Sequence, residues 1–215
     1  MSIAIEWSDM PTPERTTLDR IVSAAREVLE SEGLDAVTMS AVADRVGVRA
    51  PSLYKRVQSR DHLIGLVIES TLRQLAAALD AALEDADLVT ASGGARQDAR
   101  AGRAAIIALA GEFRAFALAA PAAFRLVFAD LPAAARPSDA SITATSAAIV
   151  RAATLVVGEQ YALEAARTVT AWTYGFVSME LAGAFRLGGD VQRAYDYGVE
   201  RLAAAIADGG VAPLG

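Results

Sequence analysis

Residues 37–63 read VTMSAVADRVGVRAPSLYKRVQSRDHL, and this stretch decides the fold. Its apolar residues recur with the spacing of two short helices, which we expect over 39–46 and 50–57. Ala43 is small where the two helices must approach closely, and Gly47 can adopt the positive φ that a tight turn between them needs. The residues expected on the buried faces are Val42, Val46, Val48 and Leu53. The pattern predicts a helix-turn-helix motif.

The same stretch is basic although the protein is acidic. The formal net charge of the 215 residues is -6, yet five cations and no acid lie between Arg45 and Arg60. The second helix of such a motif enters the major groove of DNA, where cations neutralise phosphates and the first residues reach base edges. Phosphate contacts are predicted for Thr38, Tyr54, Lys55 and Arg60. Contacts at base edges or around the helix start are predicted for Arg49, Ala50, Ser52 and Arg56.

Composition favours an all-α protein. Hydrophobic residues make up 53% of the chain, and much of that share is alanine, which favours helices. The chain has no cysteine and a single histidine, His62, so we expect no disulfide, no thiolate or histidine metal centre and no Ser/His/Asp triad. We therefore predict a protein that is not an enzyme and that holds no metal or cofactor.

No segment predicts insertion into a membrane. The N-terminal residues include acids and lack the apolar core of a secretory signal. The most apolar long windows are interrupted by charge, at Glu112 and Arg114 in one and at Arg167 and Glu180 in the other. We expect a soluble, cytoplasmic protein with no membrane partner.

Helix start and stop signals divide the chain into about nine helices. Residues 12–14 (Thr-Pro-Glu) predict the start of the first helix, and Gly33 predicts its end. Later helices are expected near residues 59–86, 98–119, 121–129, 141–157, 162–187 and 191–207. We predict an N-terminal DNA-binding domain over residues 1–60, after a loose arm at 1–11, and a C-terminal helical domain for ligand binding and dimerisation over residues 61–215.

Aromatic side chains recur on the helices of the C-terminal domain. Clustered aromatic residues and methionine can line a pocket for a small apolar ligand, although the same stripes are typical of plain core. The residues predicted to bind a ligand are Phe113, Phe116, Phe124, Phe128, Trp172, Tyr174, Phe176 and Met179. Glu112 and Glu180 lie in apolar windows, where each can meet a cationic ligand, pair with an arginine such as Arg114 or Arg167, or face water.

The stretch VTMSAVADRVGVRAPSLYKRVQSRDHLIGLV resembles the N-terminal domain of the TetR/AcrR family of bacterial transcription regulators, and the match covers about Leu18 to Val67. Two later stretches, EFRAFALAAPAAFRLVFA and AWTYGFVSMELAGAF, resemble a subgroup of C-terminal domains in that family. The resemblance implies a helix-turn-helix dimer that represses a promoter until a small ligand binds the C-terminal domain. Positions that match common phosphate contacts of the family are Thr38, Tyr54, Lys55 and Arg60, and Ser52 matches a position that often lies at the groove.

Three positions depart from the family pattern. Arg49 stands where the family usually has a Ser or Thr cap, so the start of the third helix is expected to be less well capped and more cationic. Val57 replaces the commoner phenylalanine, which keeps the site apolar but smaller. Tyr174 precedes Gly175 where a His-Gly pair is common, so a ligand role tied to that histidine does not carry over directly.

A dimer has a functional reason in such a protein, because two heads about 34–36 Å apart can read a palindrome. We predict a homodimer through the last two helices, bound to a palindromic double-stranded operator. A small apolar effector would tilt the fourth helix and release the operator. The alternatives are a helical protein-interaction module, a small-molecule-binding protein without DNA binding, or an enzyme acting on a small apolar substrate, and an activator in place of a repressor also stays open.

Overall fold

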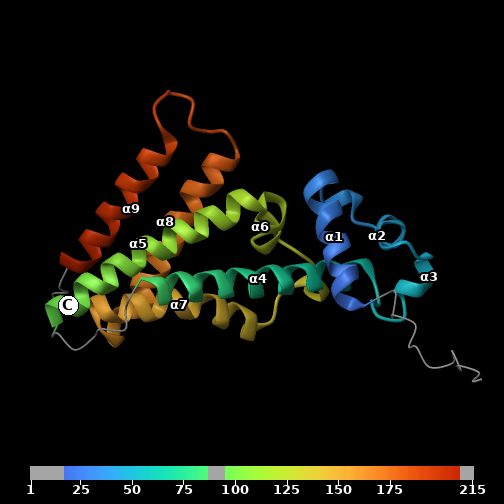
Figure 1. Ribbon diagram of the computed structural model, residues 1–215, viewed down its shortest axis with the longest axis horizontal. Helices are drawn as coiled ribbons and strands as arrows, with labels where there is room; N and C mark the ends of the chain where they lie inside the picture. Colours follow the sequence, from blue (N-terminus) through green and yellow to red (C-terminus); the bar gives the residue numbers. More distant parts are fainter. Residues whose placement is uncertain (1–16, 87–94, 209–215) are drawn as a thin grey trace, which may run out of the picture.

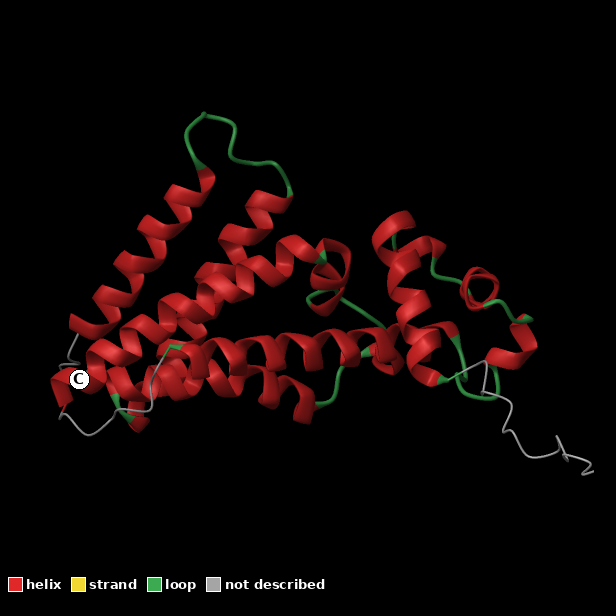
Figure 2. Cartoon of the chain, viewed as in Figure 1, coloured by secondary structure: helices red, strands yellow, loops and turns green. Residues whose placement is uncertain are grey.

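The computed structural model describes residues 17–86 and 95–208, and every regular element in these ranges is helical (Figures 1 and 2). The α-helices are α1 (Leu18–Glu32), α2 (Met39–Val46), α3 (Ala50–Leu53), α4 (Arg60–Asp85), α5 (Ala95–Ala119), α6 (Pro121–Val127), α7 (Asp139–Val157), α8 (Ala162–Leu181) and α9 (Val191–Asp208). Three 3-10 turns join them, η1 (Leu34–Ala36), η3 (Ala133–Ala135) and η4 (Glu159–Tyr161). The prediction of an all-α chain is confirmed.

The helices form an elongated molecule (Figure 1). Helices α1, α2 and α3 lie together at one end, and we call this group the head. Helix α4 leaves the head and runs along the rest of the chain beside α5 and α7, while α8 and α9 form a hairpin that packs on α5. The head contacts the remaining helices through α4 and α6.

Side-chain caps set the start of α1 and α2. The Thr17 hydroxyl accepts a hydrogen bond from the Arg20 amide at 3.3 Å, so α1 begins at Leu18. The helix start predicted at residues 12–14 and the arm predicted at residues 1–11 lie outside the described residues. The Thr38 hydroxyl caps α2 in the same way, by accepting from the Ala41 amide.

Glycine residues end α1 and α2. Gly33 ends α1 with a φ of 87°, and Gly47 ends α2 in the left-handed conformation with a φ of 79°. Residues with a Cβ rarely adopt this conformation, and the predicted role of Gly47 in the turn is confirmed. The amides of Gly47 and Val48 both donate to the Ala43 carbonyl at 3.0 Å, which closes the turn of the motif.

Helix α3 is shorter than predicted. It ends at Leu53 and not at Val57, because the amides of Arg56 and Val57 both donate to the Leu53 carbonyl and tighten the chain into a turn. The side chain of Arg49 makes no capping hydrogen bond at the start of α3, as the sequence indicated. Leu53 and Val57 are nevertheless fully buried, so the turn after α3 is anchored in the core of the head.

The single histidine has a structural role at the start of α4. The His62 amide donates to the Ser59 hydroxyl at 3.1 Å, and Nδ1 of His62 accepts from the Gln58 amide at 3.1 Å. This reciprocal arrangement resembles a capping box, in which two orphan amides of a helix start are satisfied together. His62 is therefore a helix-start residue.

Helix α4 belongs to two hydrophobic cores. Its first half, through Leu72, packs into the core of the head together with Ala123 and Leu126 of α6. Its second half, from Leu75 onward, packs into a separate core with α5, α7 and α8. The proposed division of the chain at residue 60 stays a prediction, because the buried residues of the head continue beyond it along α4.

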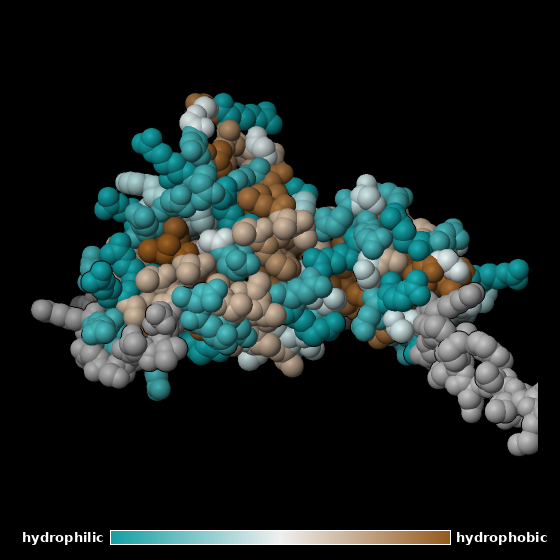
Figure 3. Space-filling view, viewed as in Figure 1, coloured by the Kyte–Doolittle hydropathy of each residue, from teal (hydrophilic) through white to brown (hydrophobic). Residues whose placement is uncertain are grey.

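Helix α8 ends earlier than predicted, at Leu181 and not at residue 187. Gly183 has a φ of 63° directly after the helix, and Gly188 and Gly189 have φ values of 81° and 89° in the loop that leads to α9. Apolar patches interrupt an otherwise largely hydrophilic surface (Figure 3), and this loop leaves Leu187 fully exposed.

A carboxylate from α4 caps the start of α7. Glu69 accepts hydrogen bonds from the Ser138 amide at 2.6 Å and from the Ser141 hydroxyl. Burial alone would raise the pKa of Glu69, but the hydrogen bonds from Ser141 and Ser138 outweigh it and leave the pKa below its usual value. By length and composition α7 is the one described helix that could cross a membrane, and here it packs against α4, α5 and α8.

Two glycines mark close approaches between helices. A Cβ on Gly102 of α5 would lie 2.7 Å from Cγ2 of Val156 and 2.9 Å from the Ala152 carbonyl oxygen, both on α7. A Cβ on Gly198 of α9 would overlap the ring of Trp172 on α8. Gly198 therefore allows α8 and α9 of one chain to pack closely against each other.

The contact at Gly102 predicts an effect on stability. We expect Gly102→Ala to lower the free energy of unfolding by about 1–3 kcal/mol, because the added methyl group must displace α7. Gly111→Ala on the same helix is the matched control, since a Cβ there meets nothing within 4 Å. The control should raise the stability by up to about 1 kcal/mol through helix propensity. Urea unfolding measures both, and equal effects of the two substitutions would contradict the packing described for α5 and α7.

Candidate nucleic-acid interface and ligand cavity

The head presents a basic surface around α3. Arg49, Lys55 and Arg56 are exposed there, and the Tyr54 side chain is 56% exposed beside them. The buried side of the same segment is apolar, with Val42 and Leu53 fully buried and Val46 and Val48 packed against them. The fold therefore separates the predicted buried and outward-facing residues of the motif.

Other predicted contact residues lie around this surface. Ala50 and Ser52 are half-buried at the start of α3. Thr38 is exposed, and its hydroxyl oxygen accepts from the Ala41 amide at 3.1 Å, so the hydroxyl proton can still be donated to a phosphate. Of the eight predicted residues, five are therefore exposed and three, Ala50, Ser52 and Arg60, are half-buried.

The eighth residue, Arg60, is engaged within the chain. Its Nε donates to the Val37 carbonyl and its Nη2 to the Leu34 carbonyl, both at 2.7 Å. These bonds join the start of α4 to the segment between α1 and α2. A guanidinium has five N–H donors, so the predicted phosphate contact of Arg60 would have to use the remaining ones.

Arg45 also differs from the other cations of the basic stretch. Its guanidinium pairs with Glu32 at 3.2 Å and with Glu27 at 3.6 Å, both on α1. The ion pairs neutralise Arg45 and direct it towards α1. Around α3 and the turn after it, the side chains of Arg49, Lys55 and Arg56 are exposed.

A cavity of about 270 Å³ lies between α4, α5, α7 and α8. Apolar side chains from α4 and α5 form much of its wall, and α7 and α8 add a few hydroxyl groups. It opens at its edge, where Phe128 and Ile142 are 42% and 47% exposed. The lining residues that carry hydroxyl groups are Thr145, Ser146, Thr170 and Thr173.

The structure brings two of the eight predicted ligand residues, Phe113 and Phe128, to this cavity. The other six lie elsewhere among the described residues. Phe124 is buried in a core between α5 and α6, and Tyr174 stacks on Phe128 with ring centroids 4.3 Å apart. Phe116 packs in the core beside α4. The rings of Trp172 and Phe176 contact the ring of Tyr195, and Met179 is exposed on α8.

Sequence analysis missed the aliphatic and hydroxyl-bearing part of the wall. Leu72, Leu75 and Leu79 line the cavity from α4, where the sequence indicated only an amphipathic helix. Thr145 and Ser146 belong to the stretch SITATSAAIV of α7, whose hydroxyl groups on an otherwise apolar helix were the available signal. Aromatic content did not mark the pocket, because most aromatic residues stack on one another.

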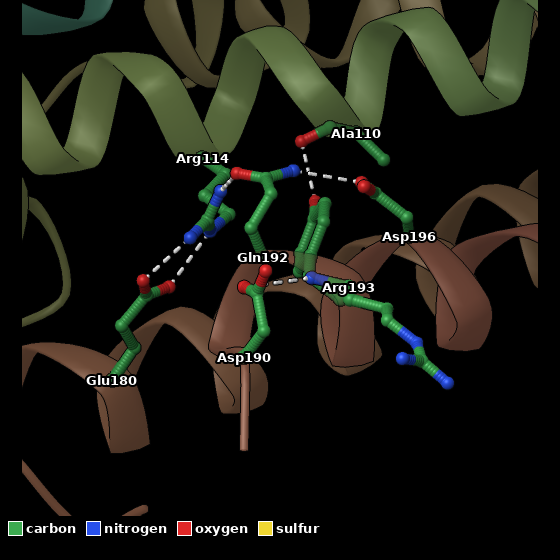
Figure 4. Close-up of polar contacts among 8 residues, drawn as sticks. Ala110, Arg114, Glu180, Asp190, Gln192, Arg193 and Asp196 are labelled. Atoms are coloured by element: carbon green, nitrogen blue, oxygen red, sulfur yellow. Dashed lines mark hydrogen bonds and ion pairs between the residues drawn. The ribbon is translucent and has the colours of Figure 1, made fainter.

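A polar network holds α5, α8 and α9 together behind the cavity (Figure 4). The Arg114 guanidinium makes two hydrogen bonds to the Glu180 carboxylate, at 2.5 and 2.7 Å, and a further one to Gln192. The hydrogen bonds to Glu180 raise the pKa of Arg114. Of the alternatives for Glu180, pairing with Arg114 is confirmed, and this carboxylate is committed within the chain.

Tyr195 links this network to the cavity wall. Its hydroxyl donates to the Ala110 carbonyl at 2.5 Å, and Ala110 lines the cavity. Burial raises the pKa of Tyr195 to about 12, against smaller opposing effects of the Thr173 hydroxyl and of Arg114. The buried hydroxyl of Thr173 on α8 lies close enough to Tyr195 to lower this pKa.

In residues 17–86 and 95–208, no three side chains of the metal-ligating types converge. The arrangement of the described residues therefore offers two features with chemical meaning. One is the exposed cationic surface around α3, and the other is the apolar cavity with a buried hydroxyl.

Two family models match the chain. The one described as "Bacterial regulatory proteins, tetR family" matches residues 21–67, and the one described as "Tetracyclin repressor-like, C-terminal domain" matches residues 106–202. Together they cover well over half of the 215 residues. The first match contains the helix-turn-helix, and the second contains α6, α7 and α8.

Individual proteins agree with these matches. The chain is 37% identical over 77 residues to the HTH-type transcriptional repressor DrrR1 of Streptomyces coeruleorubidus, which is 34% of this chain but only 28% of that relative's length. The crystal structure of the regulatory protein SCO4313 is 26% identical, with a TM-score of 0.69 over 90% of this chain and 98% of that one. BioQ crystallised with its double-stranded DNA operator shares the fold, at 22% identity and a TM-score of 0.60 over 90% of this chain and 99% of that one. The chain therefore belongs to the TetR family of bacterial transcription regulators, and it is not an enzyme.

Proposed function

We propose that this protein is a ligand-responsive repressor that binds a palindromic DNA operator as a homodimer and leaves it when a small apolar molecule occupies the cavity. The observation that carries this proposal is the acid-free stretch from Arg45 to Arg60, which keeps Arg49, Lys55 and Arg56 exposed around α3 in a chain of formal net charge -6. Salt screens charges beyond about 10 Å, so the acidic remainder does not cancel this local field. A cytoplasmic location, where DNA is accessible, is part of the proposal.

Each residue of the surface has a proposed partner on DNA. Lys55, the Tyr54 hydroxyl and the Thr38 hydroxyl would contact phosphates, which fix the position of the head but carry no sequence information. Arg49 and Ser52 at the start of α3 would reach base edges, and an arginine on guanine is the commonest specific contact.

Arg56, Ala50 and Arg60 have different proposed roles. Arg56 would add a contact at the groove, and Ala50 would allow close approach of α3. For Arg60 we favour a positioning role, because two of its donors already hold the Leu34 and Val37 carbonyls.

The switch would act through two connections between the cavity and the head. Leu72, Leu75 and Leu79 of α4 line the cavity. Arg60, at the start of the same helix, donates to two carbonyl groups of the segment that precedes α2. Helix α6 provides the second connection, because Phe128 lines the cavity while Glu30 of α1 accepts from two amides at the start of α6, at 2.8 and 3.0 Å. A ligand must bind the off-DNA arrangement more tightly for release to occur.

Dimerisation is proposed to use the outer surfaces of α8 and α9. Ala171 and Met179 of α8 and Tyr197 of α9 are exposed there, and a Cβ on Gly175 would meet nothing within 4 Å. Small residues with open space beside them permit a second helix to approach closely. A two-fold pair of this kind would place one head on each half of a palindrome.

The DNA-binding surface is tested with charge removals inside one stretch. We expect Lys55→Ala to weaken binding to all duplexes and to lower the slope of affinity against salt by about 1, and Arg49→Ala to cost about 1–3 kcal/mol on the operator and relax its sequence preference. Arg45→Ala is the matched control, because Arg45 is paired with Glu27 and Glu32. Gel-shift titrations on the promoter region of the protein's own gene at several salt concentrations measure all three. A loss in Arg45→Ala as large as that in Lys55→Ala would argue against this surface.

The proposed dimer surface is tested by a larger side chain at Gly175, where the single chain leaves open space. Gly175→Leu should leave the helix content unchanged but shift the protein from dimer to monomer, because the leucine would occupy the space of the partner helix. Gly111→Leu on α5 is the control, since a Cβ there also meets nothing within 4 Å of its own chain. Sedimentation equilibrium gives the masses, and a monomeric unmodified protein, or a dimer that tolerates Gly175→Leu, would exclude the proposed interface.

A further inference from the structure

We infer that residues 127–142, which run from the end of α6 into the start of α7, carry a displacement from the cavity to the head through a contact with Gly65 of α4. We call these residues the strap. This inference rests on the proposed function, because it concerns the same cavity. It adds the contact that would regulate release from DNA and the residue on which that contact depends.

Both ends of the strap line the cavity, and its middle lies on α4 (Figure 1). Val127 and Phe128 contribute to the cavity wall at one end of the strap, and Pro137 and Ile142 contribute at the other. Between these ends the 3-10 turn η3 packs against α4, and Ala135 is fully buried in the core of the head. One short segment therefore contacts both the space that a ligand would fill and the core of the head.

Backbone atoms of the strap approach α4 closely at Gly65. A Cβ on Gly65 would lie 3.3 Å from the Ala134 carbonyl oxygen and 3.4 Å from Cα of Ala135, which is tighter than an ordinary van der Waals contact. Gly65 is buried and has no side chain, and both facing residues are alanines. No side chain at this contact can change its rotamer to absorb a movement, so a displacement of the strap reaches the backbone of α4 directly.

Hydrogen bonds within the strap hold its shape. The Ala135 amide donates to the Pro132 carbonyl at 2.9 Å, and the Arg136 amide donates to the Ala133 carbonyl at 3.3 Å. Nε of Arg136 also donates to the Leu131 carbonyl at 3.3 Å. Because these bonds close the turn on itself, we expect η3 to move as one unit when the ends of the strap are displaced.

One face of α4 contacts the strap and continues into the cavity wall. Gly65 and Glu69 are one helical turn apart, and Leu72 follows on the same face. Glu69 accepts from the Ser138 amide at 2.6 Å, which attaches the second end of the strap to α4. Leu72 lines the cavity. The contact at Gly65, the attachment at Glu69 and the cavity therefore lie in sequence along one side of α4.

A large apolar molecule in the cavity would move the strap away from α4. A cavity of about 150 Å³ holds the single ring of benzene, whereas this cavity measures about 270 Å³. The dye N-phenyl-1-naphthylamine has three aromatic rings, so it would push the leucines of α4 and the ends of the strap apart. Ala135 would then separate from Gly65. Arg60 lies little more than one turn before Gly65 and donates to the segment before α2, so this separation would change how α4 packs in the head.

A methyl group at Gly65 tests this contact, because it must displace the strap in the same direction as a ligand. We expect Gly65→Ala to bind the dye about three- to fivefold more tightly and the operator more weakly by a similar factor, since the substitution shifts the protein towards the ligand-binding arrangement. Gly65→Val should enlarge both changes. Gly111→Ala on α5 is the matched control and should change neither affinity, because a Cβ there meets nothing within 4 Å.

The two affinities are measured separately on the full chain. Fluorescence of the dye reports its binding without DNA, and decan-1-ol, a second uncharged and largely apolar molecule, should displace it. Gel-shift titrations on the promoter region of the protein's own gene report operator binding without the dye. Gly65 does not line the cavity, so a purely structural role would not tighten dye binding. Opposite changes in the two affinities therefore distinguish coupling from damage to the fold.

Amide hydrogen exchange tests the movement in the unmodified protein. The amides of Ala135 and Arg136 are bonded within η3, where the strap packs against α4. We expect the dye to speed the exchange of residues 131–138 at least about threefold, because the strap leaves α4, and the operator to slow it. Residues 148–153 of α7 include several buried alanines and are the internal control, whose exchange the dye should not speed.

Three results would overturn the inference: dye affinity that Gly65→Ala leaves unchanged or lowers, exchange of the strap that the dye does not speed, or an unmodified protein that binds neither dye nor decan-1-ol. The dye measurements contain no DNA, so they are independent of operator binding. A strap that responds to the dye in a protein that binds no duplex would retain the route from the cavity and contradict the proposed function. A protein that binds its operator and releases it with the dye, but whose strap does not respond, would do the reverse.

Discussion

Helix α4 is the constraint on which the rest of the structure depends, because one continuous helix is packed into two cores. Its 26 residues correspond to about 39 Å of length, and it runs from the head along α5 and α7 (Figure 1). Leu63 and Ile68 are buried with the head, whereas Leu75 and Leu79 are buried beside the cavity. We propose that this helix, packed at both ends, transmits a displacement of the cavity wall to the head.

Hydrogen bonds at the starts of α6 and α7 would carry a movement of one helix to its neighbours. Glu69 joins α4 to the start of α7, and Glu30 joins α1 to the start of α6. Carboxylates favour the positive end of a helix dipole, so these bonds hold the helix starts without needing cations nearby. Both α6 and α7 also contribute to the cavity, at Val127 and at Ile142. Glu30 and Glu69 thus serve internal attachment, while the cations around α3 stay on the surface.

Local signals in the sequence were sufficient for the head and for the helix count. Gly47 and the Thr38 cap depend on neighbouring residues only, and sequence spacing shows them directly. The fate of Arg60 could not be predicted, because its partners at Leu34 and Val37 meet it only after α4 packs against α1. The sequence alone does not distinguish an arginine that contacts DNA from one that donates hydrogen bonds to backbone carbonyls of its own chain.

The cavity shows the same limit more strongly. Its walls come from helices far apart in the chain, so no single stretch of sequence outlines it. Aromatic residues were the obvious candidates, but Trp172 and Phe176 stack on Tyr195 and help to join α8 to α9. The space is bounded instead by leucines of α4 and hydroxyl groups of α7 and α8, whose roles depend on which helix faces are left unfilled.

The distance between the two heads of a dimer tests the central role of α4 most directly. The chain has no cysteine, so Ser40→Cys on α2, which is exposed, gives one spin label in each subunit for pulsed electron resonance. With the operator bound, the account predicts one narrow distance distribution. Saturating decan-1-ol, an uncharged and largely apolar probe of the cavity, should shift the centre of this distribution by several ångströms as α4 tilts. A distribution that stays unchanged while the alcohol is shown to occupy the cavity would contradict the account.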